Sequence, residues 1–222
     1  MVSKHKIIAI DGPSSSGKGT IAKIVAHKLG FSYLDSGSIY RTLGLLVVRN
    51  HLDAELNVPE ILDLIAQMDL SFNIEGVFIA GENISDKIRD EKVGMMASIL
   101  GKNPKIRESL LKFQRDFALK NDLVTDGRDM GSVVFPDAQL KVFLSASVDK
   151  RAQRRFNQLQ LLEKSVKMES ILRDIQIRDE QDSSRAVAPL RYDSSYKKLD
   201  NTDLSIDDCV NQILLWYQQS IQ

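Results

Sequence analysis

The chain has 222 residues, of which 43% are hydrophobic and 27% are charged, which is typical of a globular protein with a sizeable core. Thirty basic and thirty acidic residues cancel, which argues against a general nucleic-acid binder. The single cysteine, Cys209, excludes an intrachain disulfide and suits a reducing compartment. No stretch approaches the roughly 20 apolar residues of a membrane span, and the first apolar run is too short for a signal peptide, so a cytoplasmic location is expected.

The first part of the chain alternates strand and helix patterns. The expected elements are a strand at 6–10, a turn-rich loop at 11–17, a helix at 20–29, a strand at 31–34 and helices at 38–48 and 57–68. A strand–helix–strand unit of this kind predicts parallel strands joined by a right-handed crossover.

This alternation breaks in the next part of the chain. Two short strand patterns at 70–74 and 77–80 flank Glu75 and Gly76, which predicts a hairpin, and Ile84 could add a third short strand. Residues of about 60–100 are therefore interpreted as an insertion in an α/β core.

The alternation then resumes up to the C-terminus. The expected elements are a helix at 106–119, a strand at 123–125, a strand at 141–144, helices at 148–162 and 169–182, a last strand near Leu199 and a final helix up to residue 218. Ser205 is the expected N-cap of that last helix. Cys209 falls on its apolar side and is interpreted as a buried structural thiol.

The strongest motif is a glycine-rich loop between the first strand and the first helix. It consists of Gly12, Pro13, Ser14, Ser15, Ser16, Gly17, Lys18, Gly19 and Thr20. Glycines let backbone N–H groups surround phosphate oxygens, the following helix offers its positive end, and a lysine adds a point charge. Gly19 stands where many such loops carry Ser or Thr, so direct Mg²⁺ ligation by the Thr20 hydroxyl does not follow from the pattern. A plain surface turn is the alternative, but spacing, lysine and both flanking elements agree with phosphate binding.

Charged residues also gather after the third core strand and on the later helices. Asp126, Arg128 and Asp129 directly follow a buried strand, where charges are costly unless they are paired or functional. Arg178, Asp182 and Arg185 share one helical face, as do Arg151, Arg154 and Arg155. Taken alone, either helical set could be a salt-bridged surface.

Four segments together resemble the bacterial cytidylate kinases, type 1, within the nucleoside-monophosphate kinases. They are Ala-Ile-Asp-Gly-Pro-Ser at 9–14, Leu-Asp-Ser-Gly-Ser-Ile-Tyr-Arg at 34–41, Asp-Gly-Arg-Asp-Met-Gly-Ser-Val-Val-Phe-Pro at 126–136 and Arg-Ala-Val-Ala-Pro-Leu at 185–190. They occur in the expected order and are far more specific than the phosphate loop alone.

The resemblance implies a three-layer α/β fold of the P-loop NTPase type with a central parallel sheet. One kinase domain over 1–222 would carry a small β-containing subdomain for the monophosphate at about 60–100 and a helical lid at about 151–170. The family tends toward monomers, so a monomer is expected.

The resemblance also implies which residues bind the acceptor CMP or dCMP. They are Ser36, Tyr40, Arg41, Ser98, Arg107, Arg128, Asp129, Arg178, Asp182 and Arg185. Ser98 and Arg107 would read the base, Asp182 would hold the ribose hydroxyls, and Arg128 would contact the acceptor phosphate. Tyr40 and Arg41 are expected on the first turn of a helix. Plain packing for Tyr40, and surface positions for Ser98 and Arg107, are the alternatives.

On the donor side, the resemblance implies that ATP binds residues 12–20 and that Arg151, Arg154 and Arg155 are lid arginines that close over it. The residues expected to act in catalysis are Lys18, Arg128, Asp129, Arg178 and Arg185. Mg²⁺ would accompany ATP, and Asp126 occupies a Walker-B-like position from which a carboxylate could orient the ion through water.

The expected activity is therefore phosphoryl transfer from ATP to CMP or dCMP, with no nucleic-acid polymer and no membrane as partner. A GTP-binding switch is a different-class alternative, but its Asn-Lys-x-Asp and Asp-x-x-Gly motifs do not occur in the sequence. A kinase for UMP, AMP or shikimate is a second alternative, against which the 126–136 segment argues. His5, His27 and His51 lie outside every motif and are interpreted as structural or solvated.

Overall fold

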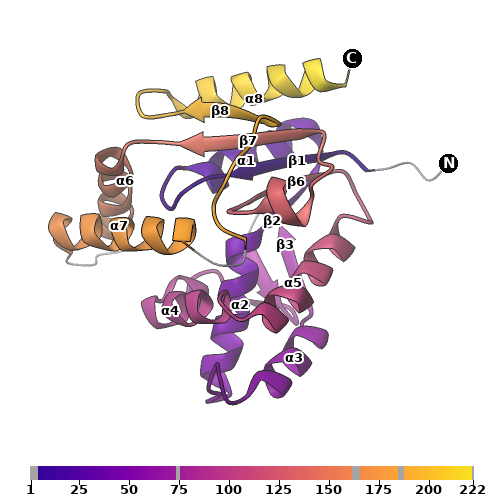
Figure 1. Cartoon of the computed structure of the whole chain (residues 1–222), viewed down its shortest axis with the longest axis vertical. Coiled ribbons are helices and arrows are strands. Elements are labelled where there is room, and N and C mark those ends of the chain that lie inside the picture. The colour runs from indigo at the N-terminus through magenta and orange to yellow at the C-terminus, as the bar shows by residue number, and fades with distance from the viewer. Residues whose placement is uncertain (1–4, 74–75, 162–165, 185–187, 222) are drawn as a thin grey trace. The chain divides into compact units, whose positions relative to one another are not determined.

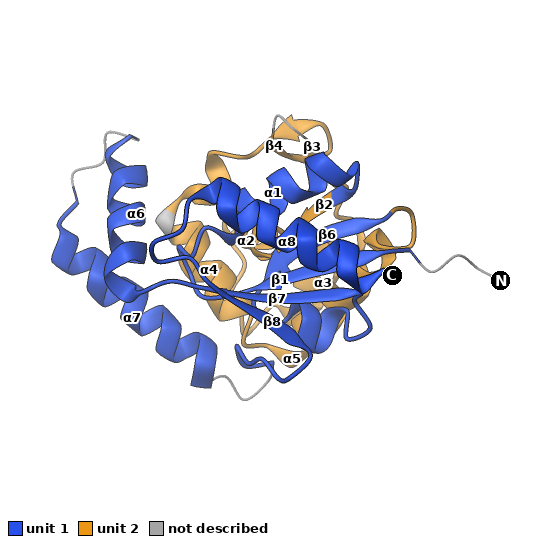
Figure 2. Cartoon of the chain, turned by 90° about the horizontal axis from the view of Figure 1, so that it is seen from above, with its two compact units in different colours: residues 1–32, 122–222 blue, residues 33–121 orange. Residues whose placement is uncertain are grey.

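The computed structural model (Figure 1) describes residues 5–73, 76–161, 166–184 and 188–221. The chain divides into two compact units, coloured in Figure 2: unit 1 comprises residues 1–32 and 122–222, and unit 2 comprises residues 33–121. Arg185, one of the predicted site residues, lies outside the described residues. Among the described residues, no helix has the length and apolar character needed to cross a membrane.

Unit 1 is an α/β unit built on parallel strands. Its elements are β1 (Ile7–Asp11), α1 (Lys18–Leu29), β6 (Leu123–Gly127), a π-helical turn (Met130–Val134), β7 (Leu140–Ser145), α6 (Val148–Gln160), α7 (Met168–Ser184), β8 (Tyr196–Asp200) and α8 (Ile206–Ser220). The strands lie in the order β6-β1-β7-β8, and each neighbouring pair is parallel. This order confirms the predicted α/β class with a central parallel sheet.

The core of unit 1 explains why β1 begins with a continuous apolar run. Ile8, Ala9 and Ile10 of β1 are all 0% exposed, as are Val124 of β6 and Val142 of β7. Strands of a parallel sheet are covered on both faces, so they need no alternating polar side.

Helices α1 and α8 pack against each other beside these strands. Next to α1, the ring of Phe31 meets the ring of Tyr217 of α8 edge-on, with centroids 5.7 Å apart. Ser205 caps α8 in a capping box with Asp208, which confirms the N-cap predicted from the sequence. Cys209 is 1% exposed, as expected of a structural thiol, and burial raises the pKa of its thiol.

Helices α6 and α7 form a small cluster of their own in unit 1. Ala152, Ile171 and Ile175 are buried in it, and Phe156 and Leu172 pack against them. The two helices agree in position with the predicted helices at 148–162 and 169–182. The lid role predicted for residues of about 151–170, which include most of α6 and only the start of α7, stays a prediction.

Unit 2 combines helices with a small antiparallel sheet. β2 (Ser32–Asp35) leads into it, followed by α2 (Ser36–Arg49), α3 (Val58–Ala66), β3 (Leu70–Asn73), β4 (Gly76–Ile79), β5 (Glu82–Asn83), a 3₁₀ turn (Lys87–Arg89), α4 (Glu91–Leu100) and α5 (Pro104–Phe117). β3 and β4 pair antiparallel, which confirms the hairpin, and β5 adds a third strand next to the position expected for Ile84. The predicted insertion at 60–100 falls within this unit.

Two local features of unit 2 differ from the sequence predictions. Helix α4 is not among the elements predicted from the sequence. It packs on α2 where Gly44 leaves room, since a Cβ at Gly44 would lie 2.9 Å from the Val93 carbonyl oxygen. Helix α2 begins at Ser36, because Asp35 caps it by accepting the Ser38 N–H at 2.9 Å. Tyr40 and Arg41 therefore lie in the second turn of α2, and their predicted place on its first turn is wrong.

Candidate active site

The phosphate loop of unit 1 leaves β1 through a glycine that nothing larger can replace. A Cβ on Gly12 would lie 2.1 Å from the Leu144 carbonyl oxygen of β7, far inside contact distance. Only glycine, which has a hydrogen atom in place of Cβ, lets the backbone come this close to the neighbouring strand. This contact fixes where the loop departs from the sheet.

The loop then passes through two left-handed backbone positions before α1 begins. Gly17, the N-cap residue of α1, has φ 90° and makes no side-chain cap hydrogen bond, and Ser15 has φ 59°. A left-handed serine is a strained conformation of the kind that gathers at ligand sites. Because α1 begins at Lys18, directly after Gly17, the positive end of this helix lies at the loop.

Two buried hydroxyls in the loop have no partner among the described residues. Ser14 Oγ and Ser16 Oγ are both inaccessible to solvent and without a hydrogen bond. Unpaired buried hydroxyls are costly, so a polar ligand is the natural partner for them. Lys18 is also buried, and its Nζ donates to the Pro13 carbonyl oxygen at 3.1 Å. The loop thus holds a cation, two hydroxyls and a helix N-terminus together, which suits phosphate.

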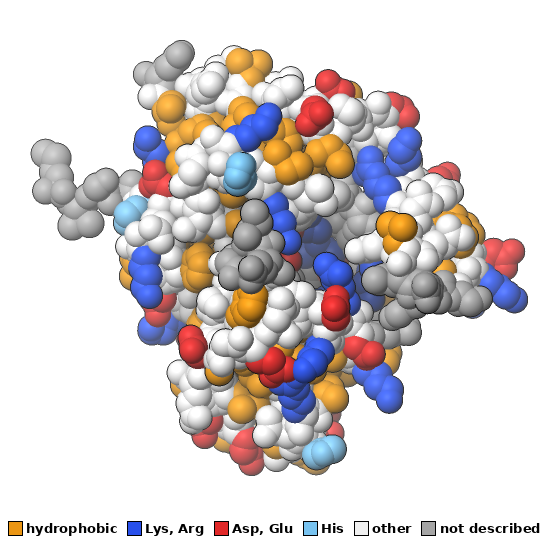
Figure 3. All heavy atoms as spheres, turned by 180° about the vertical axis from the view of Figure 1, so that it is seen from behind, with side chains coloured by type: hydrophobic (Ala, Val, Ile, Leu, Met, Phe, Trp, Pro, Cys, Tyr) orange, Lys and Arg blue, Asp and Glu red, His pale blue; other side chains and the backbone are white. Residues whose placement is uncertain are grey.

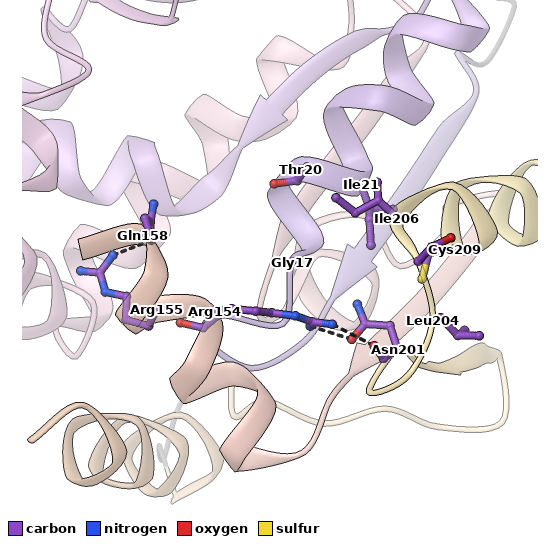
Figure 4. A pocket seen from close by; sticks show the side chains of 12 residues that line it. Gly17, Thr20, Ile21, Arg154, Arg155, Gln158, Asn201, Leu204, Ile206 and Cys209 are labelled. Atoms are coloured by element: carbon purple, nitrogen blue, oxygen red, sulfur yellow. Dashed lines mark hydrogen bonds between the residues drawn. The ribbon is translucent and has the colours of Figure 1, made fainter. Parts of the chain in front are cut away.

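A pocket of about 390 Å³ lies beside the phosphate loop, within unit 1 (Figure 4). It is lined by Ser15, Gly17, Thr20, Ile21, Arg154, Arg155, Gln158, Asn201, Leu204, Ser205, Ile206 and Cys209. Its volume falls within the range of small-molecule sites, and four apolar side chains share its walls with seven polar ones. A planar base attached to a phosphate chain fits this combination.

Arg154 ties the pocket to the loop. Its guanidinium donates to the Ser16 carbonyl oxygen at 3.1 Å, to Asn201 Oδ1 at 3.0 Å and to the Asn201 carbonyl oxygen at 2.8 Å. Asn201 itself donates to the Ser16 carbonyl oxygen at 2.8 Å. Figure 4 shows Arg154 reaching from α6 to Asn201, while Arg155 pairs with Gln158 on its own helix.

The segment after β6 carries the predicted acidic and basic residues of unit 1. Asp126 and Asp129 are 5% and 6% exposed, at the carboxyl end of a parallel strand. Arg128 Nε donates to Asp182 Oδ2 of α7 at 2.5 Å. These two predicted site residues are 54 positions apart in the sequence and form an ion pair. Half-buried Arg178 lies one turn before Asp182 on the same helix.

Asp126, the residue predicted to orient Mg²⁺, is 5% exposed and lies on β6. No group of three or more acidic, His or Cys side chains that could hold a metal occurs among the described residues. Mg²⁺ commonly binds one or two carboxylates together with substrate phosphates and water. Asp126 is a buried carboxylate on β6, the strand that pairs with β1, and it is compatible with that mode.

In unit 2, one of the two predicted base-reading residues, Arg107, lies next to Tyr40. The Arg107 guanidinium lies over the Tyr40 ring at 5.8 Å and donates to the Gly101 carbonyl oxygen at 3.2 Å. Ser98 is exposed on α4, one turn before Gly101.

Two further predicted residues of unit 2 lie on α2. Arg41 donates to the Ile88 carbonyl oxygen at 2.9 Å, and the Arg41 guanidinium lies against Gly94, where a Cβ would come within 3.1 Å of it. Ser36 is buried at the N-terminus of the helix.

Sequence reasoning missed several residues that shape the site in unit 1. Asn201, Leu204 and Ile206 line the pocket although no motif contains them. Asp11 is 0% exposed and accepts the N–H groups of Met130 and Gly131 at 2.8 Å each. A charged residue at the end of a buried strand was the available signal for Asp11.

Charges of both signs are interspersed on the face drawn in Figure 3. This distribution agrees with the balanced composition of thirty basic and thirty acidic residues. A single-sign surface of the kind that binds nucleic-acid backbones is not what this face presents.

Comparison with known proteins matches the chain to one family over nearly its whole length. Residues 8–219 match the family model described as cytidylate kinase. The chain is 46% identical to a cytidylate kinase of Polynucleobacter asymbioticus over 97% of each chain. It is 45% identical to a cytidylate kinase of Vibrio cholerae over the full length of both. In fold, it resembles a solved uncharacterized protein from Eubacterium ventriosum, with a TM-score of 0.57, 14% identity and coverage of 96% of this chain and 99% of that one. From these matches, together with the phosphate loop, the chain belongs to the cytidylate kinase family.

Proposed function

We propose that this chain transfers the γ-phosphoryl group of ATP to CMP and dCMP, forming CDP and dCDP. Membership of the cytidylate kinase family supports the reaction class. The observation that carries the proposal is the phosphate loop, in which buried Ser14 and Ser16 hydroxyls lack partners among the described residues beside Lys18. The adjoining pocket of about 390 Å³ supplies space for the donor's base.

The donor triphosphate lies along residues 12–20 in this proposal. Lys18 and the α1 N-terminus stabilise the charge of its outer phosphates. The base enters the pocket beside Arg154, Asn201 and Leu204. Arg155, which also lines the pocket, contacts ATP.

The residues that bind the acceptor CMP or dCMP in this proposal come from several stretches of the chain. Those of unit 2 are Ser36, Tyr40, Arg41, Ser98 and Arg107, and those of unit 1 are Arg128, Asp129, Arg178, Asp182 and Arg185. A set of donors and acceptors that pairs with the edge of cytosine rejects uracil, because the wrong base would leave buried polar groups unpaired.

The chemistry requires positioning and charge stabilisation more than a base. The phosphate of CMP is already an anion near neutral pH, so no proton needs removal before it attacks. Lys18, Arg128 and Arg178 distribute the negative charge that develops on the moving group. Mg²⁺ bound with ATP would neutralise phosphate charge further, and Asp126 is the side chain that would hold it.

Closure of α6 and α7 over ATP would exclude water and so prevent hydrolysis. The enzyme works as a monomer in the cytoplasm, where ATP and CMP meet. Neither a membrane nor a nucleic-acid polymer takes part.

A coupled assay of ADP release across CMP, dCMP, UMP, AMP and shikimate tests the proposal. Rapid turnover with CMP and dCMP, and little ADP without an acceptor, is expected. ADP release that does not depend on any acceptor would reduce the protein to an ATPase. Preference for UMP, AMP or shikimate would replace cytidine nucleotides as the substrate class.

A further inference from the structure

Arg151 differs from the two arginines that share its helix face. Its side chain is 4% exposed, and every nitrogen of its guanidinium donates to another part of unit 1. Nε donates to the Ala146 carbonyl oxygen at 3.0 Å, and one terminal nitrogen donates to the Ser14 carbonyl oxygen at 3.2 Å. The two terminal nitrogens also bind the two oxygens of Asp179, at 3.0 and 2.5 Å.

These contacts join three segments that are far apart in the sequence. Ala146 follows β7, Ser14 lies in the phosphate loop, and Asp179 belongs to α7. The bidentate pair has a fixed planar geometry, so it specifies orientation as well as distance. Burying an arginine is costly unless its charge and its N–H groups are compensated, and here all three nitrogens donate hydrogen bonds and a carboxylate pairs with the charge.

Asp179 occupies an informative place on α7. It directly follows Arg178 and stands three residues before Asp182, both of which belong to the proposed acceptor site. The Arg151 guanidinium therefore links α7, which carries Arg178, to the phosphate loop, in which the buried Ser14 hydroxyl has no partner among the described residues. A shift of about 1 Å at a reacting group can lower turnover about a hundredfold.

Arg154 and Arg155 line the pocket beside the phosphate loop, whereas Arg151 is not among its lining residues. We propose that Arg151 and Asp179 form a positioning pair, which holds α7 in register with the phosphate loop. Arg151 acts on ATP through the Ser14 backbone and not as a ligand of its own. This inference rests on the proposed phosphoryl transfer. It gives Arg151 a positioning role in place of the predicted contact with ATP, and it adds Asp179.

The test compares Asp179→Asn with Asp174→Asn in the full chain. D179N keeps the size of the side chain and removes the charge that Arg151 binds. D174N makes the same change at an exposed position of the same helix. We expect D179N to lower kcat with ATP and CMP about tenfold or more, and D174N to leave it within about twofold.

A second measurement separates positioning from plain stability. If the Arg151–Asp179 pair acts by positioning Arg178, D179N should have little effect on kcat in an enzyme that already lacks the Arg178 side chain. In an Arg178→Ala background, D179N should therefore lower kcat by less than about twofold, a non-additive result typical of coupled residues. Arg151→Lys, which keeps the charge and loses the fork, should behave as D179N does. Thermal melts identify which variants are folded. If D179N is not folded, Asp179→Glu takes its place, and the same changes in kcat are expected of it.

Two results would overturn the inference while leaving the proposed function intact. One is a D179N enzyme with the kcat of the parent. The other is an effect of D179N that is equal in the parent and in the R178A background. A parent enzyme that releases no ADP with CMP would instead contradict the proposed function.

Discussion

The hydroxyl of Tyr196 donates a hydrogen bond of 2.8 Å to Asp11 Oδ2, although the two residues are 185 positions apart. The same carboxylate accepts the N–H groups of Met130 and Gly131. Asp11 thus ties β1, which leads into the phosphate loop, to the segment after β6 and to β8. A Cβ on Gly131 would lie 2.6 Å from the Tyr196 hydroxyl, so the glycine makes room for this arrangement.

Tyr196→Phe should lower stability in a pH-dependent way. Burial raises the pKa of Asp11 above its ordinary 3.8, while the hydrogen bonds from Gly131, Met130 and Tyr196 lower it. A raised carboxyl pKa means that Asp11's contribution to the free energy of unfolding falls as pH rises from 3.8 through the folded pKa. Losing the Tyr196 donor raises that pKa further, so the cost of Y196F should be small near about pH 4 and grow to about 1–3 kcal/mol towards neutral pH.

Urea unfolding of Y196F and the parent across this pH range provides the measurement. Tyr192→Phe is the matched control, because Tyr192 is 45% exposed and packs against Phe143, whereas the hydrogen bonds to Asp11 described above come from Met130, Gly131 and Tyr196. A cost of Y196F that stays the same at all pH values would contradict the role of the ionised carboxylate.

Lys18→Ala and Arg178→Ala should each lower kcat about a hundredfold or more without unfolding the chain. Each removes a cation that stabilises charge on the transferred group, an effect of that order when one such donor is lost. Steady-state kinetics with ATP and CMP, together with circular dichroism, check both expectations. Exposed Lys28 of α1 and exposed Arg173 of α7 supply matched alanine controls. Normal turnover in K18A would remove Lys18 from the catalytic assignment.

Gly12→Ala should abolish ATP binding and destabilise unit 1. The added methyl would meet the Leu144 carbonyl oxygen at 2.1 Å, and the strand cannot yield without loss of its pairing. Overpacking of this kind costs about 1–3 kcal/mol or more. Calorimetric titration with ATP and thermal melting are the measurements.

Gly30→Ala is the control for this substitution. Gly30 has φ 67°, but no atom lies within 4 Å of a Cβ placed there. Gly30→Ala should lower the free energy of unfolding by about 1 kcal/mol, because alanine is strained in the left-handed backbone conformation. It should leave the affinity for ATP unchanged. Equal ATP affinity in G12A and the parent would show that the close approach at Gly12 is unimportant for the loop.

Leu204→Trp should raise the KM for ATP about tenfold and leave the KM for CMP unchanged. Leu204 lines the pocket beside the phosphate loop, and an indole there would occupy the space proposed for the donor's base. Leu215→Trp is the control, since Leu215 is similarly exposed on α8 but does not line the pocket. If L204W raised the KM for CMP instead, the pocket would belong to the acceptor.

Arg49→Gln should raise the pKa of Glu82 from about 2 towards its ordinary value of 4.5. Hydrogen bonds from Arg49, at 2.9 and 3.1 Å, and from Lys87 hold that pKa low. A depressed carboxyl pKa gives stability that is present above pH 4.5 and is lost as pH falls towards 2. Because Glu82 is exposed, the shift should shrink with added salt.

Side-chain carboxyl NMR titration measures this shift directly. Lys92→Gln removes an exposed positive charge elsewhere in unit 2 and should leave the pKa of Glu82 unchanged. An unchanged Glu82 pKa in R49Q would mean that Lys87 alone holds the carboxylate.

The sequence alone predicts the parts of this protein that depend on neighbouring residues. The glycine spacing of residues 12–20, the apolar run of β1 and the Ser205 cap are local patterns, so the phosphate loop and most helices and strands were predictable. Helix α4 was not predicted, because its stability comes from packing on α2 at Gly44.

Only the tertiary structure decided which charged residues meet. Arg151, Arg154 and Arg155 look equivalent in the sequence, yet Arg151 is buried against Asp179 and the Ser14 backbone while the other two line a pocket. Such pairs join residues tens to more than a hundred positions apart. They follow from the order of the strands and from the path of the chain, which no local pattern encodes.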